Sequence, residues 1–161
     1  MKILIFTEGT ALMPSSARDL SREERVKQSA SESDDVKNFR SYIPNGEAVS
    51  KIQNWENQGA EIYYLTSSST AQKVDDIRFV LTTFKFPDAQ NLLFRKEGQE
   101  YKDVAEELMP DIFIEDDCES IGGEAEMTYP HIKPELKPKI HSIIVKEFAG
   151  IDHLPDSIID L

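Results

Sequence analysis

The sequence is poor in cysteine, with Cys118 alone among 161 residues. One cysteine cannot form an intrachain disulfide and cannot build a cysteine-based zinc site. No apolar run approaches the roughly 20 residues that a membrane-spanning helix needs. The first apolar run, residues 3–6, is short, and Thr7-Glu8-Gly9 follows it where a signal peptide would have a small-residue cleavage site. These absences lead us to expect a cytoplasmic protein in a reducing compartment, with no membrane partner.

Basic residues are also scarce: 18 Lys and Arg stand against 30 Asp and Glu, for a net charge of −12. Such a chain is repelled by the phosphates of nucleic acids, so we expect no nucleic-acid partner. Residues 97–126 hold twelve of the acids and only one base, Lys102. This acidic block is either part of a site that needs a cation or a surface for a basic partner.

Five short apolar runs and three amphipathic helical patterns alternate along the chain. The runs lie at 3–6, 62–65, 92–94, 112–114 and 143–145, and the helical patterns at 49–59, 74–84 and 101–109. Buried strands that alternate with helices indicate an α/β fold with a parallel sheet. We therefore predict a single domain over 1–161, a Rossmann-like three-layer sandwich with five mainly parallel strands.

Two segments depart from this alternation. Residues 14–44 are rich in charge and serine, and we interpret them either as a mostly helical insertion after the first strand or as a solvated excursion. Residues 129–139 contain three prolines and are expected to be extended.

Residues that follow the predicted strands are the candidates for a site, because ligands of open parallel sheets bind at the carboxyl ends of the strands. Hydroxyl groups follow the first two strands at 7–10 and 66–70, and carboxylates follow the fourth at 115–119. Hydroxyls with free backbone amides suit phosphate, and clustered carboxylates suit Mg²⁺.

The order of these residues resembles the motifs of the haloacid-dehalogenase-like (HAD-like) superfamily of phosphatases and phosphotransferases. Phe6-Thr7-Glu8-Gly9-Thr10 stands where the family has Asp-x-Asp-Gly-Thr or Val. Thr66 ends the second core strand, Lys102 lies upstream of the fourth, and Ile114-Glu115-Asp116-Asp117 ends it. The resemblance spans nearly the whole chain except 14–44. It implies phosphate binding by Gly9, Thr10, Thr66, Ser67 and Lys102, and Mg²⁺ binding by Asp116 and Asp117.

The first motif departs from the family at its first residue. Phe6 stands at the position of the family's nucleophilic and metal-binding Asp, and a phenyl ring can neither attack phosphorus nor bind a metal. The resemblance thus implies that any Mg²⁺ site has lost a main ligand and is weak. Glu8 stands at the position of the family's general acid/base and is one methylene longer than the family's Asp.

Each candidate residue also has a purely structural interpretation. Glu8 can be a strand-end acid, and residues 66–70 can be the N-cap of a helix that begins near Ala71. Lys102 and Glu106 have the i,i+4 spacing of a surface ion pair. Repulsion between Asp116 and Asp117 can be relieved by a metal or by Lys102.

The cysteine, the glycine pair and the histidines do not indicate a separate catalytic or metal site. Cys118 lies among carboxylates, which raise the pKa of its thiol and argue against thiol catalysis. Gly122-Gly123 indicates a turn rather than a phosphate cradle. The three histidines, His131, His141 and His153, have no metal-binding spacing.

Three hypotheses for function remain. The first is a HAD-like protein that lacks the phosphoaspartyl mechanism and binds a phosphorylated or anionic small molecule or a partner. The second is an active phosphomonoester hydrolase with a rearranged site, in which Glu8 is the acid/base and a metal at Asp116 and Asp117 activates water. The third is an interaction protein whose acidic face binds a basic partner.

Overall fold

A central parallel sheet organises the structure, a computed structural model that describes all 161 residues. Its five strands lie in the order β5-β4-β1-β6-β7, and every neighbouring pair is parallel. The strands are β1 (Lys2–Phe6), β4 (Glu61–Leu65), β5 (Leu92–Leu93), β6 (Ile112–Asp116) and β7 (His141–Val145). This topology confirms the predicted Rossmann-like α/β fold with a five-stranded parallel sheet.

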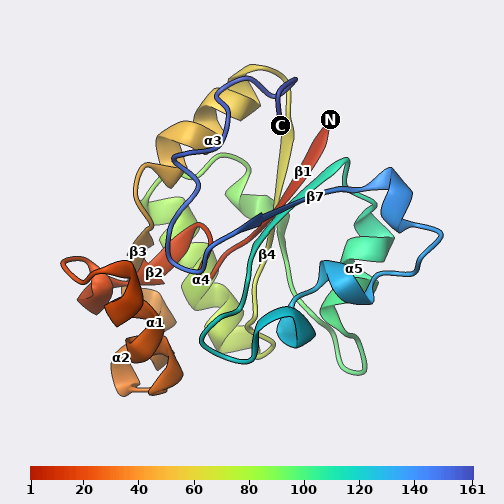
Figure 1. Cartoon of the computed structure of the whole chain (residues 1–161). Coiled ribbons are helices and arrows are strands. Elements are labelled where there is room, and N and C mark those ends of the chain that lie inside the picture. The colour runs from red at the N-terminus through yellow and green to blue at the C-terminus, as the bar shows by residue number, and fades with distance from the viewer.

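Alternate residues of β1 pack against different helices, because successive side chains of a strand point to opposite faces. Ile3 and Ile5 belong to the larger core with α3 (Ala48–Asn57) and α4 (Ala71–Thr83). Leu4 belongs to the smaller core with α5 (Tyr101–Leu108). The two sets of helices lie on either side of the strands in Figure 1, which gives the three layers.

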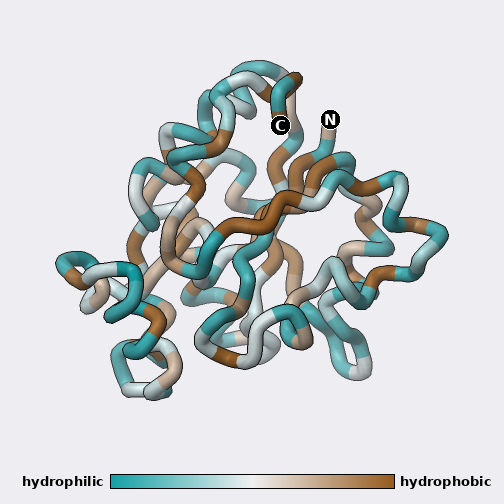
Figure 2. Tube along the Cα trace, viewed as in Figure 1, coloured by the Kyte–Doolittle hydropathy of each residue, from teal (hydrophilic) through white to brown (hydrophobic).

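The insertion after β1 is helical, as one of the two interpretations of 14–44 predicted. It contains α1 (Arg22–Ala30) and α2 (Asp34–Lys37), and Ser21 begins α1 with a capping box to Glu24. Its base is a two-stranded antiparallel ribbon of β2 (Leu12–Pro14) and β3 (Tyr42–Pro44), which the sequence analysis did not predict. Neither α1 nor α2 has a buried residue, and both helices are mostly hydrophilic in Figure 2.

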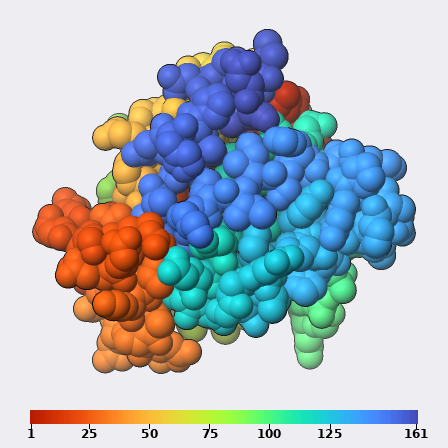
Figure 3. Space-filling view, viewed as in Figure 1, coloured from red at the N-terminus to blue at the C-terminus, as the bar shows by residue number.

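The insertion is held to the sheet domain by both apolar and polar contacts, and its Tyr42 belongs to the larger core. Nη1 of Arg22 lies 2.7 Å from Oε2 of Glu119, and Nη1 of Arg25 donates to the carbonyl oxygen of Phe148 at 3.2 Å. In Figure 3 the insertion, red to orange, lies against the cyan segment that follows β6. The insertion therefore covers one side of the carboxyl end of the sheet.

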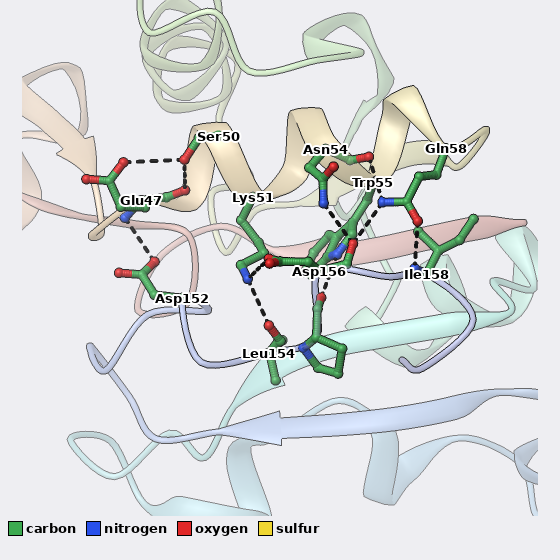
Figure 4. Close-up of polar contacts among 11 residues, drawn as sticks. Glu47, Ser50, Lys51, Asn54, Trp55, Gln58, Asp152, Leu154, Asp156 and Ile158 are labelled. Atoms are coloured by element: carbon green, nitrogen blue, oxygen red, sulfur yellow. Dashed lines mark hydrogen bonds and ion pairs between the residues drawn. The ribbon is translucent and has the colours of Figure 1, made fainter.

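The segment after β7 returns across the molecule and lies along α3 (Figure 4). The indole Nε1 of Trp55 donates to the carbonyl oxygen of Pro155 at 2.9 Å. The side-chain amides of Asn54 and Gln58 both donate to the carbonyl oxygen of Asp156 at 2.8 Å. Side chains of α3 thus bind backbone groups of the C-terminal segment and fix its path.

The prediction of an extended chain over 129–139 is wrong. Tyr129–His131 and Lys137–Lys139 each form one turn of 3₁₀-helix, with proline near the first position of each. The fixed φ of proline suits the start of a helical turn, where its missing N–H is not needed. None of the helices has both the length and the apolar character that crossing a membrane requires.

Candidate functional site

A cavity of about 390 Å³ opens at the carboxyl end of the sheet, beneath the insertion. The loops after β1, β4, β6 and β7 contribute to its walls, and residues 29–39 of the insertion line the opposite side. The strand ends that the sequence singled out do therefore meet at one place. Of the predicted site residues, Glu8, Gly9, Ser67 and Asp116 line this cavity.

Glu8 and the loop after β4 are joined by hydrogen bonds. The Thr66 hydroxyl donates to Oε1 of Glu8 at 2.5 Å, and the backbone N–H of Ser67 donates to Oε2 at 3.1 Å. The Thr7 hydroxyl lies 2.5 Å from the same Oε2. The N-cap role falls to Thr70, whose side chain accepts from the N–H of Lys73, so Thr66 and Ser67 are not the helix cap.

Asp116 is the last residue of β6 and is 4% exposed. Its Oδ2 accepts from the Thr10 hydroxyl at 2.8 Å, and its Oδ1 accepts from the N–H of Cys118 at 3.0 Å. Burial raises the pKa of Asp116 to about 7, and the charges of Glu147 and Glu115 act in the same direction, against these two hydrogen bonds. In this structure the Thr10 hydroxyl is therefore bonded to Asp116, and it does not line the cavity as the predicted phosphate-binding role would require.

Two further buried carboxylates line the cavity. Glu115 accepts from the N–H groups of Thr128 and Tyr129, both at 2.8 Å, and Glu147 accepts from the N–H and the hydroxyl of Ser120, both at 2.7 Å. Burial raises the pKa of both carboxyl groups. The sequence analysis missed Glu147, although its place after the fifth strand was a signal that could have found it.

Asp117 has different partners from Asp116. Its Oδ2 is 2.8 Å from Nζ of Lys146 and its Oδ1 accepts from the N–H of Glu147. Burial acts to raise its pKa, but the hydrogen bonds from Lys146 and Glu147 outweigh burial, so the pKa is lowered. No group of three or more His, Cys, Asp or Glu is arranged to hold a metal ion. With Phe6 at the end of β1, and with Asp116 and Asp117 each bonded to different groups, the residues do not fit a Mg²⁺ ion between them.

Lys102 does not line the cavity. Its Nζ lies 2.7 Å from Oε2 of Glu100, and Glu106 instead pairs with Lys133 at 2.9 Å. The i,i+4 pair of Lys102 with Glu106 is therefore not formed. Lys102 is a surface base at the start of α5.

Arg95, unlike Lys102, does line the cavity, beside an aromatic pair. The Cζ of Arg95 lies 4.0 Å from the ring centroid of Tyr101, and the rings of Tyr101 and Phe6 meet edge to face at 5.4 Å. Arg95 forms no ion pair, and its buried Nε has no hydrogen-bond partner. The sequence analysis missed Arg95, although it follows the third apolar run just as the other candidates follow theirs.

Cys118 lies at the same end of the sheet and is partly buried. Burial raises the pKa of its thiol, and the charges of Asp116, Glu115 and Glu147 raise it further, as the sequence analysis expected. Gly122 and Gly123 both have positive φ, of 139° and 74°, as the predicted turn requires.

Solved structures of known proteins share this fold. Two structures of the class C acid phosphatase from Bacillus anthracis, one with tungstate bound, match with TM-scores of 0.58 and 0.59. Their sequences are 16% and 15% identical to this chain, and the matches cover 92% of it and 68% and 67% of the phosphatase. The Pnkp1/Rnl/Hen1 complex contains a chain that matches at TM-score 0.56 and 12% identity, over 91% of this chain and 46% of its own. No protein-family model and no curated protein matches the sequence.

Proposed function

We propose that this protein keeps a HAD-like phosphatase fold without phosphoaspartyl chemistry, and that it binds a small phosphorylated or otherwise anionic molecule in the cavity. One observation carries the proposal. The end of β1 presents the ring of Phe6 to the cavity, where the resembling family has its nucleophilic carboxylate, and the ring is packed against Tyr101. A phenyl ring has no lone pair with which to form a phosphoenzyme.

The remaining carboxylates of the cavity do not replace that nucleophile. Glu8, Glu115, Asp116 and Glu147 each accept at least two hydrogen bonds from neighbouring N–H or hydroxyl groups. These bonds orient each of the four carboxylates toward its own donors in the cavity wall. Under this proposal these four acids hold the walls of the cavity, and none of them is its nucleophile.

Arg95 is the group that we assign to the anionic part of the ligand. The other base in the cavity wall, Lys37, lies 3.6 Å from Glu32, whereas Arg95 has no carboxylate partner. A guanidinium stacked on an aromatic ring keeps its N–H edge free for a phosphate or carboxylate. The rings of Phe6 and Tyr101 beside it favour a ligand with an apolar or aromatic portion.

Titration calorimetry with phenyl phosphate tests this proposal. We expect the unaltered protein to bind it, and Arg95→Ala to weaken binding about tenfold or more, because a charge-assisted pair is lost. Lys102→Ala is the matched control: it also removes one positive charge, but outside the cavity, and should leave binding nearly unchanged. Equal losses in the two variants would show that only net charge matters and would contradict the assignment of Arg95.

A second candidate is an active phosphomonoester hydrolase with a rearranged site. The observation that favours it is the position of Asp116, which lines the cavity and is buried. Burial raises its pKa to about 7, which suits a group that gives and takes protons near neutral pH. Under this alternative, turnover of a phosphomonoester is present and Asp116→Asn abolishes it.

A further inference from the structure

We infer that the carboxylate of Glu8 is an internal substitute for a bound oxyanion, which occupies the donors of Thr66 and Ser67 and keeps free phosphate away from them. This inference rests on the proposed function for the ligand's class, and it makes Glu8 a specificity-determining residue. Because Glu8 occupies these donors, an anionic ligand of the cavity has Arg95 as its binding partner.

The hydrogen-bond directions around Thr66 are fixed by its neighbours. The backbone N–H of Ser68 donates to Oγ1 of Thr66 at 3.1 Å, so that oxygen already accepts one bond. Its single proton points at Oε1 of Glu8, 2.5 Å away. A hydroxyl has one proton to donate, and here it is already used.

The second donor of the loop is used in the same way. The N–H of Ser67 donates to Oε2 of Glu8 at 3.1 Å, and the Thr7 hydroxyl lies 2.5 Å from the same oxygen. A hydroxyl and a backbone N–H that converge on two oxygens form the donor set of an oxyanion site. In this structure the two oxygens that accept from these donors are the carboxylate oxygens of Glu8.

No basic side chain forms an ion pair with Glu8. The carboxylate forms no ion pair with Lys, Arg or His, so its charge is balanced only by these donors. Its backbone is held in a tight loop, because the N–H groups of Ala11 and Leu12 both donate to the carbonyl oxygen of Thr7, at 3.0 and 2.8 Å. The carboxylate therefore stays at the donors, and a phosphate that entered there would have to displace it and would meet its charge.

Removal of the side chain tests the inference, with inorganic phosphate as the probe in titration calorimetry. We expect Glu8→Ala to bind phosphate about tenfold or more tightly than the unaltered protein, because charge-assisted donors become free. Glu126→Ala is the matched control. Glu126 lines the same cavity and carries the same charge, but it accepts none of these hydrogen bonds, so its removal should change phosphate binding far less.

A third variant identifies the donor. Thr66→Val in the Glu8→Ala background should return phosphate binding to that of the unaltered protein. If Glu8→Ala loses its circular dichroism spectrum, Glu8→Gln and Glu126→Gln take the places of the two alanine variants, with a smaller gain expected because the amide keeps the volume.

Equal phosphate binding by the Glu8 and Glu126 variants would overturn the inference, and so would a gain that survives Thr66→Val. Failure of phenyl phosphate to bind the unaltered protein would instead contradict the proposed function. The comparison of the Glu8 and Glu126 variants with inorganic phosphate does not depend on that result.

Discussion

Gly9 lies so close to Asp116 that a Cβ at Gly9 would stand 2.7 Å from Oδ2 of the carboxylate. Gly9 also has a φ of +86°, a conformation that residues with a side chain rarely adopt. The loop after β1 can therefore approach the end of β6 only with glycine at this position. That approach lets the Thr10 hydroxyl reach Asp116.

Gly9→Ala should lower the free energy of unfolding by roughly 2 kcal/mol or more, because backbone strain and steric overlap add. Gly98→Ala is the control, since Gly98 has a φ of +80° and nothing within 4 Å of its Cβ position. Its cost should be that of strain alone, about 1 kcal/mol. Urea unfolding measures both values, and equal values would show that Asp116 does not press on Gly9.

Asp116→Asn should change how stability depends on pH. The folded state raises the pKa of Asp116 from 3.8 to about 7, so between these values the folded protein keeps a proton that the unfolded chain releases. This group thus makes stability fall as pH rises through that window. From about pH 5 to about pH 8, the unaltered protein should lose about 3 kcal/mol relative to Asp116→Asn. Glu115 and Glu147 are present in both proteins, so their titration cancels in the comparison. Urea unfolding between pH 5 and pH 8 measures the two stabilities. If the stabilities of the two proteins ran parallel with pH, the pKa of Asp116 would lie near its ordinary value.

The side chains of α3 that hold the C-terminal segment should be needed for its docking. Asn54→Ala with Gln58→Ala removes both donors to the carbonyl oxygen of Asp156, which should lower the free energy of unfolding by about 1 to 2 kcal/mol. Trp55 is the only tryptophan and is fully buried against Pro155, so its fluorescence reports the segment directly.

The expected sign of undocking is a red shift of the emission and stronger quenching by acrylamide in the double variant. Gln53→Ala is the control, because Gln53 lies on the same helix but donates to the carbonyl oxygen of Lys85. An unshifted spectrum in the double variant would mean that other contacts hold the segment.

Phe6→Asp alone should give no turnover of phosphomonoesters. The substitution supplies the missing carboxylate, but Glu8 still accepts the hydrogen bonds of Thr66 and Ser67. A coupled assay for released phosphate measures the result, with Phe6→Asn as a control for polarity without charge. Turnover by Phe6→Asp alone would show that Glu8 does not close the site.

The order of strands and helices was readable from the sequence because it depends on local patterns. Each apolar run coincides with a strand of the sheet, and Thr70 caps α4 where the sequence placed a helix start near Ala71. The β2–β3 ribbon was not readable, since strands of three residues are too short to show alternation. The 3₁₀ turns of 129–139 are held by long-range contacts such as the hydrogen bond from the N–H of Lys133 to Oε1 of Glu106, 27 residues away.

The site was predictable as a location but not as a set of contacts. The rule that ligands bind at strand ends brought Glu8, Ser67 and Asp116 to one cavity. This rule could not predict that the side chain of Glu8, one methylene longer than that of Asp, would accept hydrogen bonds from Thr66 and Ser67 after β4. Nor could sequence spacing show that Lys102 pairs with Glu100 while Arg95 stacks on Tyr101.

The most direct test of the central claim is incubation of the unaltered protein with a ³²P-labelled phosphomonoester and Mg²⁺, followed by acid quench. With Phe6 at the end of β1, we predict neither released phosphate above the uncatalysed rate nor label on the protein. Turnover with an acid-stable, hydroxylamine-labile phosphoryl group on the chain would contradict the proposal that this protein lacks phosphoaspartyl chemistry. Turnover without such label, abolished by Asp116→Asn, would contradict it in favour of the rearranged hydrolase.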